Sequence, residues 1–400
     1  MKRDNIKTVS KKLSGKASEW DSAFSVEKAD EVLAFHKSIP GYEETPLVRL
    51  DALSKELGVS SIAVKDESPR FGLNAFKGLG GSYCIAKYLA GELGADMKDV
   101  DYDLLTSPET NEKIKDLTFV TTTDGNHGRG IAWTAKMLGV RAKVFMPKVS
   151  TRERLENIRA LGADAEITEY NYDDAVRYAK DYAEKNGWPL VQDTAWEGYE
   201  DIPLSIMQGY MTMIREAVSQ LDAPPTHVFL QAGVGAMSGA ITGFLANYYG
   251  NEKPVITIVE PDKADCIYQT ALADDGKLHF VTGDMDTIMA GLSCGEPCTI
   301  GWSLLDAHAE HFVSMPDNIA AKGMRVLASP LPGDTKILSG ESGAASFGFV
   351  CEILENPDMK DIKETIGLGP DSRILCISTE GDTDKASDRR IVWDGENPSV

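Results

Sequence analysis

The chain has 400 residues, of which 42% are hydrophobic and 26% charged, an ordinary composition for a globular protein large enough for two domains. The formal net charge of −21 argues against binding to a nucleic-acid backbone or an anionic membrane, since both attract basic surfaces. The polar N-terminus lacks the apolar core of a signal peptide, and no run approaches the roughly 20 apolar residues of a membrane span. We therefore expect a cytoplasmic protein that acts on a small molecule.

Cysteine usage points to reduced thiols. The six cysteines, at positions 84, 266, 294, 298, 351 and 376, include no CxxC pair, so we expect neither a zinc site nor a disulfide framework. Cys266 and Cys294 follow similar loop-like stretches, and the sequence leaves their pairing open. No metal site is predicted.

Taken in chain order, the first part of the sequence is only partly regular. Residues 1 to about 30 are charged and weakly patterned, with a helix expected over 25–38. A short helix over 50–58 is ended by a glycine, a strand follows over 61–64, and a further helix is expected over about 80–94. Residues 95–116 are acidic and rich in turn-forming residues, which is typical of a solvated surface segment.

From residue 117 onward, strands and helices alternate. The expected strands cover 117–121, 142–147, 165–168, 190–193, 227–231, 255–260 and 373–378. The expected helices cover 127–139, 151–162, 172–187, 203–221 and 236–249. This alternation indicates βαβ units and parallel sheets. One sheet with all these strands would be unusually large, so we predict an α/β fold of two doubly wound, mostly parallel sheets, with the active site in the cleft between domains. We expect a large domain of residues 1–85 and 195–400 and a smaller inserted domain of residues 86–194.

One lysine lies between the expected strand over 61–64 and the expected helix over about 80–94. Lys77 stands between Phe76 and Gly78, with apolar cover on one side and room for close backbone approach on the other. These are conditions in which a lysine amine is desolvated and forms Schiff bases. A solvated lysine in a turn is the ordinary alternative, and the loops downstream decide between the two.

Three loops directly follow strands, where ligands bind in doubly wound folds. The loop over 121–130 combines hydroxyls, glycines and a helix N-terminus, and predicts an oxyanion site suited to a carboxylate. The loop over 231–239 has the spacing GxGxxxG, which fits a single phosphate better than a dinucleotide. The loop over 378–384 carries hydroxyls that can bind a ring nitrogen. Asp193 adds a carboxylate at a strand end, with ordinary turn chemistry as the alternative.

In this order, the motifs resemble those of fold type II pyridoxal-phosphate enzymes, and within that group the diaminopropionate ammonia-lyases. The resemblance covers about residues 40–395 and rests on FGLNAFK (71–77), TTTDGNHGRG (121–130), QDTAWEGY (192–199), QAGVGAM (231–237), VEPDKADC (259–266), MAGLSCGEP (289–297) and STEGDTD (378–384). The general type II pattern alone would not separate a lyase from a serine dehydratase, whereas these extended motifs are specific. The first 35 residues carry no such resemblance.

The resemblance implies a role for each candidate site residue. Lys77 would hold pyridoxal 5'-phosphate as a Schiff base and, once freed, act as a base on one face of the substrate Cα. Asp124 would be the base on the other face, and Asp193 would bind the substrate β-ammonium group or assist proton transfer. The other cofactor ligands would be Asn126 at the phenolic oxygen, Ser378 or Thr379 at the ring nitrogen, and Gly233, Val234, Gly235, Ala236 and Met237 at the phosphate. The substrate carboxylate would be held by the turn of Thr122, Thr123, Asp124 and Gly125.

The implied activity is the α,β-elimination of D- and L-2,3-diaminopropionate to pyruvate and two molecules of ammonia, by an enzyme of a type that is commonly a homodimer. A serine/threonine dehydratase of the same fold is the alternative enzyme and differs in the β-leaving group. A non-catalytic ligand-binding protein with a doubly wound fold is the alternative from another class, and it predicts a colourless protein.

Overall fold

The computed structural model describes residues 5–123, 125–148 and 150–398, and the chain divides into two compact units. Unit 1 contains Met1–Val26, Glu44–Ala75 and Met213–Val400, and unit 2 contains Glu27–Glu43 and Phe76–Thr212. Helices α1 (Val26–Ser38) and α9 (Asp201–Gln220) each include one of the division points. These limits differ from the predicted cuts at 85/86 and 194/195, because α3 belongs to unit 2 from its first residue and most of α9 does too.

Within the described residues, unit 1 is built on a seven-stranded sheet in the order β1-β9-β8-β7-β10-β3-β2. Its strands are β1 (Lys7–Ser10), β2 (Leu47–Arg49), β3 (Ser61–Asp66), β7 (His227–Gln231), β8 (Val255–Pro261), β9 (His311–Met315) and β10 (Arg373–Ser378). The strands from β9 to β3 run parallel, while β1 and β2 pair antiparallel at the two edges. The predicted mostly parallel sheet is confirmed, although the sequence did not predict β1, β2 or β9.

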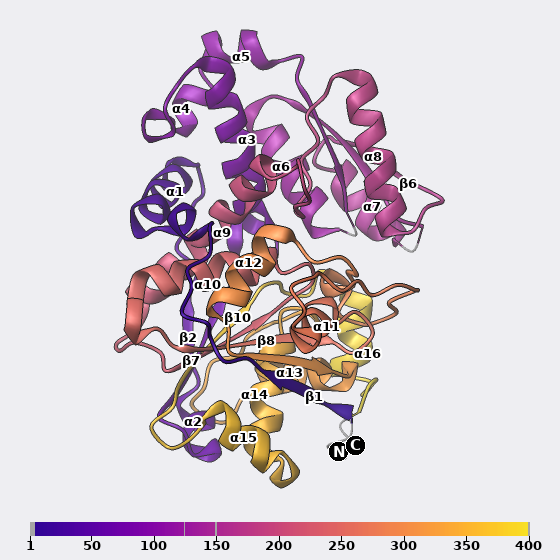
Figure 1. Cartoon of the computed structure of the whole chain (residues 1–400). Coiled ribbons are helices and arrows are strands. Elements are labelled where there is room, and N and C mark those ends of the chain that lie inside the picture. The colour runs from indigo at the N-terminus through magenta and orange to yellow at the C-terminus, as the bar shows by residue number, and fades with distance from the viewer. Residues whose placement is uncertain (1–4, 124, 149, 399–400) are drawn as a thin grey trace. The chain divides into compact units, whose positions relative to one another are not determined.

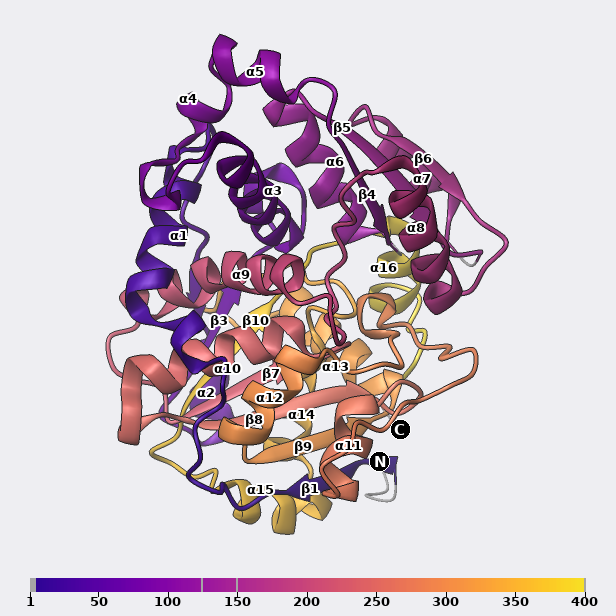
Figure 2. The same cartoon turned by 45° about the horizontal axis from the view of Figure 1, so that its top comes forward.

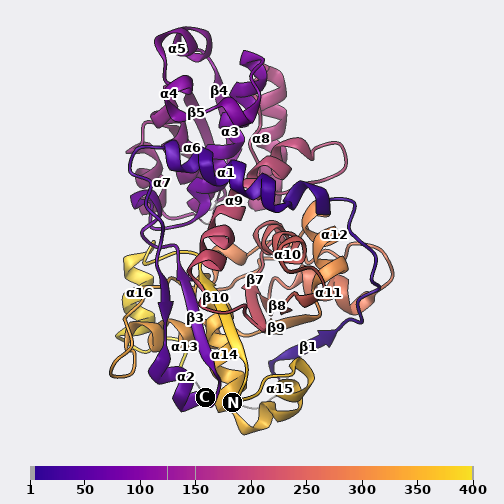
Figure 3. The ribbon, with the colours of Figure 1, turned by 90° about the vertical axis from the view of Figure 1, so that its left-hand side faces the viewer.

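Helices cover both faces of this sheet (Figure 3). The helices of unit 1 are α2 (Asp51–Leu57), α10 (Ala236–Tyr249), α11 (Cys266–Ala273), α12 (Thr299–His308), α13 (Asp317–Ala328), α14 (Ala345–Glu355), α15 (Lys360–Ile366) and α16 (Lys385–Val392). Figure 3 shows α10, α11 and α12 on one side of the strands and α13, α14 and α16 on the other. Both faces of the sheet are therefore buried, as a parallel sheet requires.

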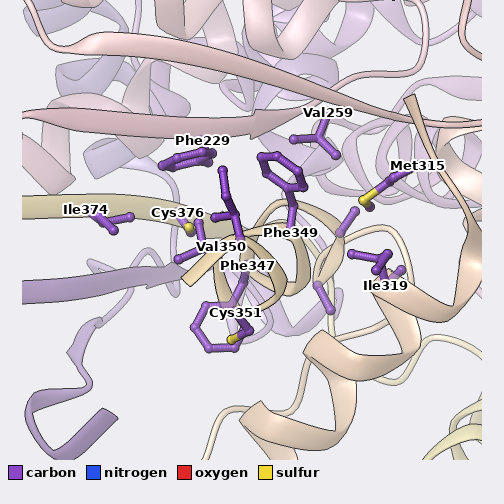
Figure 4. Packing of buried hydrophobic residues seen from close by; sticks show 14 of the residues in the cluster. Phe229, Val259, Met315, Ile319, Phe347, Phe349, Val350, Cys351, Ile374 and Cys376 are labelled. Carbon is purple, nitrogen blue, oxygen red and sulfur yellow. The ribbon is translucent and has the colours of Figure 1, made fainter. Parts of the chain in front are cut away.

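Helix α14 forms the centre of the larger hydrophobic core. It packs against β7, β8 and β10, and Figure 4 shows Phe347, Phe349 and Val350 of this helix beneath the sheet. The rings of Phe349 and Phe229 lie 6.1 Å apart between centroids. This core holds the carboxyl ends of β7 and β10 side by side, which fixes the loops that follow them.

Unit 2 contains a three-stranded parallel sheet in the order β4-β5-β6, formed by β4 (Thr118–Thr122), β5 (Arg141–Met146) and β6 (Asp164–Ile167). Its helices beyond α1 and α9 are α3 (Lys77–Leu93), α4 (Tyr102–Leu105), α5 (Pro108–Ile114), α6 (Asn126–Leu138), α7 (Arg152–Arg159) and α8 (Tyr172–Asn186) (Figure 1). Two predictions are corrected here. Residues 190–193 form no strand but a single bridge from Leu190 to Val120, and the segment over 95–116 contains α4 and α5.

Two further findings bear on the sequence predictions. None of the six cysteines, all of which lie in the described part of the chain, forms a disulfide in the structure. Among the described residues, no helix has the length and apolar character needed to cross a membrane.

Candidate active site

Lys77 is the first residue of α3, and 22% of its side-chain surface is exposed. Its Nζ lies 5.4 Å from the centre of the Phe76 ring and 5.9 Å from that of the Tyr210 ring. Burial raises the pKa of the Tyr210 phenol above its ordinary value, so this neighbour stays neutral at physiological pH. The predicted apolar cover beside Lys77 is therefore confirmed, and it comes from two rings.

The glycines after Lys77 lie inside α3 and allow close helix packing, and the helix begins at Lys77 rather than at about residue 80 as the sequence predicted. A Cβ on Gly80 would lie 2.5 Å from Cε1 of Tyr210, and a Cβ on Gly209 of α9 would lie 2.8 Å from Cα of Gly80. A Cβ on Gly130 of α6 would lie 3.0 Å from the carbonyl oxygen of Lys77. No larger residue fits at these contacts, so the glycines position the first turn of α3 between α6 and α9.

Asp193 forms an ion pair with Lys77 inside unit 2. The Asp193 side chain is 8% exposed, and its Oδ2 lies 3.7 Å from Nδ1 of His127. Burial acts to raise the pKa of Asp193, but the facing His127 ring and the Lys77 amine outweigh it and hold this pKa at about 2. The structure thus contains an ionised, water-excluded carboxylate in contact with the amine predicted to bind a cofactor.

The segment that carries this carboxylate is fixed by hydrogen bonds on both sides. The Gln192 N–H donates to the Tyr199 hydroxyl oxygen (2.9 Å), and the Gln192 side-chain oxygen accepts the N–H of Thr122 (3.0 Å). His127 Nε2 donates to the carbonyl of Val191 (2.8 Å). The polar segment therefore replaces the predicted strand, because its backbone bonds to α6 and the following turn and the Gln192 side chain bonds to β4.

The predicted carboxylate turn follows β4. The N–H of Thr122 donates to Gln192, the N–H of Thr123 donates to a carbonyl of β5 (3.0 Å), and the N–H of Gly125 donates to the Thr123 hydroxyl (2.9 Å). Asp124, the predicted second base, lies outside the described residues. The N–H groups of Thr122, Thr123 and Gly125 thus already have acceptors within unit 2, and the Thr123 hydroxyl, which accepts from Gly125, keeps its own hydrogen to donate to an anion.

Two helices begin at this site. Lys77 starts α3 and Asn126 starts α6, and Figure 2 shows these helices side by side. Gly130 lies one turn after Asn126 and contacts the Lys77 carbonyl, so the start of α6 lies close to the start of α3. Unit 2 therefore brings together the predicted residues Lys77, Thr122, Thr123, Gly125, Asn126 and Asp193.

In unit 1, the predicted phosphate loop joins β7 to α10. Gly235 has a φ of +88°, a left-handed conformation that favours glycine, and α10 begins at the next residue. A Cβ on Gly233 would lie 3.2 Å from the carbonyl oxygen of Gly291, so the loop is packed too closely for a side chain there. The Val234 carbonyl accepts the N–H of Cys298 (2.7 Å). The first N–H groups of α10, those of Ala236 and Met237 included, have no acceptor within the helix, which is the arrangement that binds anions at helix N-termini.

The predicted hydroxyl site lies beside this loop, at the end of β10. The Gln231 side chain, at the end of β7, donates to the Thr379 hydroxyl oxygen (3.1 Å) and accepts from Ser346 (3.0 Å). The Ser378 hydroxyl donates to Ser339 (2.8 Å), and Ser378 and Thr379 are 1% and 4% exposed. Unit 1 thus brings the predicted phosphate loop and the predicted ring-nitrogen hydroxyls together through Gln231.

Three residues at these sites received no role from the sequence: His127, Tyr210 and Gln231. His127 and Gln231 do lie in the quoted motifs TTTDGNHGRG and QAGVGAM, so their place in the loops was visible. Tyr210 lies in the middle of α9, where an aromatic residue is indistinguishable from ordinary core.

Comparisons with known proteins identify the family of this chain. The family model described as pyridoxal-phosphate dependent enzyme matches residues 39–379. The chain is 53% identical to the diaminopropionate ammonia-lyase of Salmonella typhimurium, over 92% of this chain and 92% of that protein. It matches the crystal structure of the holo diaminopropionate ammonia-lyase of Escherichia coli with a TM-score of 0.92 and 46% identity, over 98% of both chains. A structure of the E. coli enzyme with an aminoacrylate–PLP azomethine reaction intermediate matches with a TM-score of 0.90 and 45% identity over the same shares. The chain therefore belongs to the diaminopropionate ammonia-lyases, within the pyridoxal-phosphate-dependent enzymes of fold type II.

Proposed function

We propose that this chain catalyses the α,β-elimination of 2,3-diaminopropionate, in both its D and L forms, to pyruvate and two molecules of ammonia. One observation carries the choice of substrate. The Asp193 carboxylate is buried, stays ionised with a pKa of about 2, and already contacts an amine. The substrate's β-ammonium group is a cation of the same kind, whereas the β-hydroxyl of serine offers no charge to such a carboxylate.

The described residues fit pyridoxal 5'-phosphate. The glycine loop from Gly233 to Met237 supplies a helix N-terminus with no room for side chains at Gly233, which suits the phosphate. The Lys77 amine would hold the cofactor's aldehyde carbon, and Asn126 its phenolic oxygen. When bound, this cofactor acts as an electron sink that makes the substrate Cα–H bond acidic.

Hydrogen-bond donors favour Thr379 over Ser378 as the partner of the cofactor's ring nitrogen. The Ser378 hydroxyl hydrogen is already directed to Ser339 (2.8 Å). The Thr379 oxygen accepts from Gln231 (3.1 Å), so its own hydrogen remains for a ligand. Gln231 therefore orients the one hydroxyl of the pair that can still donate.

The chain's own residues account for the proton movements. Lys77 takes the Cα proton on one face of the substrate, and Asp124 takes it on the other, which is why both isomers are accepted. The electron pair of the Cα–H bond forms a Cα–Cβ double bond, and the Cβ–N bond breaks with its electron pair remaining on nitrogen, so the β-ammonium leaves as ammonia. The 2-aminoacrylate that is released then reacts with one water to give pyruvate and the second ammonia.

The substrate carboxylate is assigned to the turn of Thr122, Thr123, Asp124 and Gly125. Because the N–H groups of Thr122, Thr123 and Gly125 donate within unit 2, we assign the contact to the Thr123 hydroxyl. This assignment keeps the carboxylate beside Asn126.

Steady-state rates on D-diaminopropionate, L-diaminopropionate and serine test the function. We expect diaminopropionate to be preferred in both forms, and a preference for serine would favour the dehydratase instead. Lys77→Ala should lose the visible absorption of the yellow enzyme, and a colourless wild-type protein that ignores added cofactor would favour a non-catalytic binding protein. Asp124→Asn should lower turnover of the D form far more than of the L form, and equal losses would contradict the two-base assignment.

We also propose that the enzyme is a cytoplasmic homodimer. Support comes from the fold type, from the cysteines, none of which forms a disulfide, and from the net charge of −21, which disfavours anionic membranes. Light scattering of the holoenzyme should give twice the mass of one chain, and the mass of a single chain would contradict the dimer.

A further inference from the structure

His127 contacts two different parts of the segment that carries Asp193. The side chain is 3% exposed and belongs to the first turn of α6. Its Nε2 lies 2.8 Å from the carbonyl oxygen of Val191, and a carbonyl can only accept, so Nε2 carries a hydrogen. The other ring nitrogen, Nδ1, faces the Asp193 carboxylate, 3.7 Å from the oxygen that also pairs with Lys77.

We propose that His127 is the positioning residue of the Asp193 carboxylate. Its Nε2–H fixes the ring against Val191, and its Nδ1 side then keeps that carboxylate ionised and directed to the substrate's β-ammonium group. The inference rests on the proposed function, in which Asp193 binds that group.

The need for a second partner follows from what Lys77 does. Lys77 and His127 are the two groups that lower the pKa of Asp193 against the effect of burial, His127 in its protonated form. Once the Lys77 amine is bonded to the cofactor, it no longer pairs with the carboxylate as a free ammonium group. His127 then remains beside Asp193 until the substrate's ammonium arrives.

The other ionisable groups around the carboxylate do not supply this charge. Tyr199 and Tyr210 are phenols whose pKa is raised by burial, so both stay neutral. Arg129 lies two residues after His127 on α6, and burial lowers the pKa of its guanidinium; no ion pair with Asp193 is found in the described part of the chain. Asp124, three positions before His127, lies outside the described residues.

Two substitutions separate the two contacts of His127. His127→Gln places an amide where Nε2 was, so the bond to Val191 can persist while the group that faces Asp193 is removed. His127→Asn places an amide donor where Nδ1 was, so the group that faces Asp193 persists while the bond to Val191 is lost. If His127 acts on the carboxylate, His127→Gln should raise the apparent KM for diaminopropionate about tenfold, as expected for the loss of about 1.4 kcal/mol. His127→Asn keeps a donor but no charge beside Asp193, so it should recover only part of that loss, and the KM for serine should change by less than about twofold in either variant.

A second readout does not depend on activity. In holoenzyme labelled at the histidine ring carbons, the resonance lost in His127→Gln identifies the His127 imidazole. Its pKa should fall by about one unit in Asp193→Asn, because the facing carboxylate no longer stabilises the charged ring.

These readouts distinguish failure of the inference from failure of the proposed function. A greater loss in His127→Asn than in His127→Gln, or parallel losses on both substrates, would show that His127 serves only to anchor Val191 and would overturn the inference. If wild-type enzyme prefers serine, the proposed substrate is wrong, and the ring titration still decides whether His127 and Asp193 are coupled. An unchanged imidazole pKa in Asp193→Asn would overturn the inference in either case.

Discussion

The Lys77 amine and the Asp193 carboxylate form an ion pair within unit 2, at the start of α3, and the Asp193 side chain is 8% exposed. In our proposal, the lysine that bonds the cofactor is therefore paired with the group that binds the leaving amine. Substrate binding and cofactor bonding then depend on the same two side chains.

Asp193→Asn keeps the size of the side chain and removes its charge. A hydrogen bond to a charged group contributes about 1.5–3 kcal/mol, which corresponds to a ~10–100-fold change in binding. We expect the apparent KM for diaminopropionate to rise within that range, with a much smaller change for serine. Steady-state kinetics on both substrates measure this. A similar loss on serine would mean that Asp193 serves a step common to both substrates.

The low pKa of Asp193 also predicts how stability depends on pH. Its folded-state pKa of about 2 is below the ordinary value of 3.8, so ionised Asp193 stabilises the folded protein above about pH 4. That contribution, on the order of 2 kcal/mol, should be lost as the pH falls from about 4 toward 2. Urea unfolding of wild type and Asp193→Asn should therefore differ at pH 7 and converge near pH 2. A difference in the free energy of unfolding between the two proteins that persists near pH 2 would contradict the assigned pKa.

The helix that begins at Lys77 offers a matched pair of glycine substitutions. Gly80→Ala places a Cβ 2.5 Å from the Tyr210 ring and should cost ~1–3 kcal/mol of stability. Gly91 lies in the same helix with no atom within 4 Å of its added Cβ, so Gly91→Ala should stabilise by ~0.5–1 kcal/mol. Because Gly80 lies one turn from Lys77, its variant should also bind cofactor more weakly. Urea unfolding measures the stability of both variants, and cofactor titration measures their affinity for pyridoxal phosphate. Equal stability of the two variants would show that α3 can shift to accommodate the added Cβ.

Thr379 and Ser378 provide a test of the cofactor's ring-nitrogen partner. Thr379→Val removes the hydroxyl that still has a hydrogen to donate, and a net loss of about 0.5–1.5 kcal/mol corresponds to a ~2–10-fold weaker binding of the cofactor. Thr379→Ser should restore binding. Ser378→Ala removes a hydroxyl already bonded to Ser339 and should change cofactor affinity less. Spectrophotometric titration of apoenzyme with pyridoxal phosphate measures the cofactor affinity of all three variants. A larger loss of affinity in Ser378→Ala than in Thr379→Val would reverse the assignment.

The sequence predicted the parallel core of both units because buried parallel strands are continuous apolar runs between regular helices. It did not predict β1 or β2, since edge strands this short owe their conformation to the neighbour they pair with: β1 to β9 and β2 to β3. The helical start at Lys77 was missed for a related reason. Glycines disfavour a helix when only the local sequence is considered. They are required in the first turn of α3 because α6 and α9, which are distant in sequence, pack closely against it.

The candidate site was predictable where a loop carries its own chemistry. The glycines at 233 and 235 and the hydroxyls at 378 and 379 follow strands directly, so their neighbourhood follows from the parallel order. The contact between His127 and Asp193 was not predictable, because these residues are far apart in the chain and meet through a segment wrongly expected to be a strand. Hydrogen bonds of Gln192 and Tyr199 give that segment its shape.

A buried charge cluster in the segment leading to Lys77 gives the last prediction. Arg70 donates to Glu67 and Glu216, with N–O distances of 2.8 Å, and the Lys65 Nζ lies 2.7 Å from Glu216. Each of the four side chains is at most 2% exposed, and their charges balance. Burial acts to raise the pKa of Glu216, but Arg70 and Lys65 hold it at about 2, so the carboxylate is ionised at neutral pH.

Glu216→Gln leaves two buried cations facing one carboxylate, and breaking a buried ion pair in this way costs ~3–5 kcal/mol. Glu112→Gln, which removes an exposed pair with Lys115, should change stability by less than about 0.5 kcal/mol. Urea unfolding followed by tryptophan fluorescence measures both variants. Since Glu67 and Arg70 precede Lys77 by only a few residues, Glu216→Gln should also weaken cofactor binding. A loss of stability below about 1 kcal/mol would show that the cluster tolerates an unbalanced charge, and the segment would then be held by its backbone hydrogen bonds.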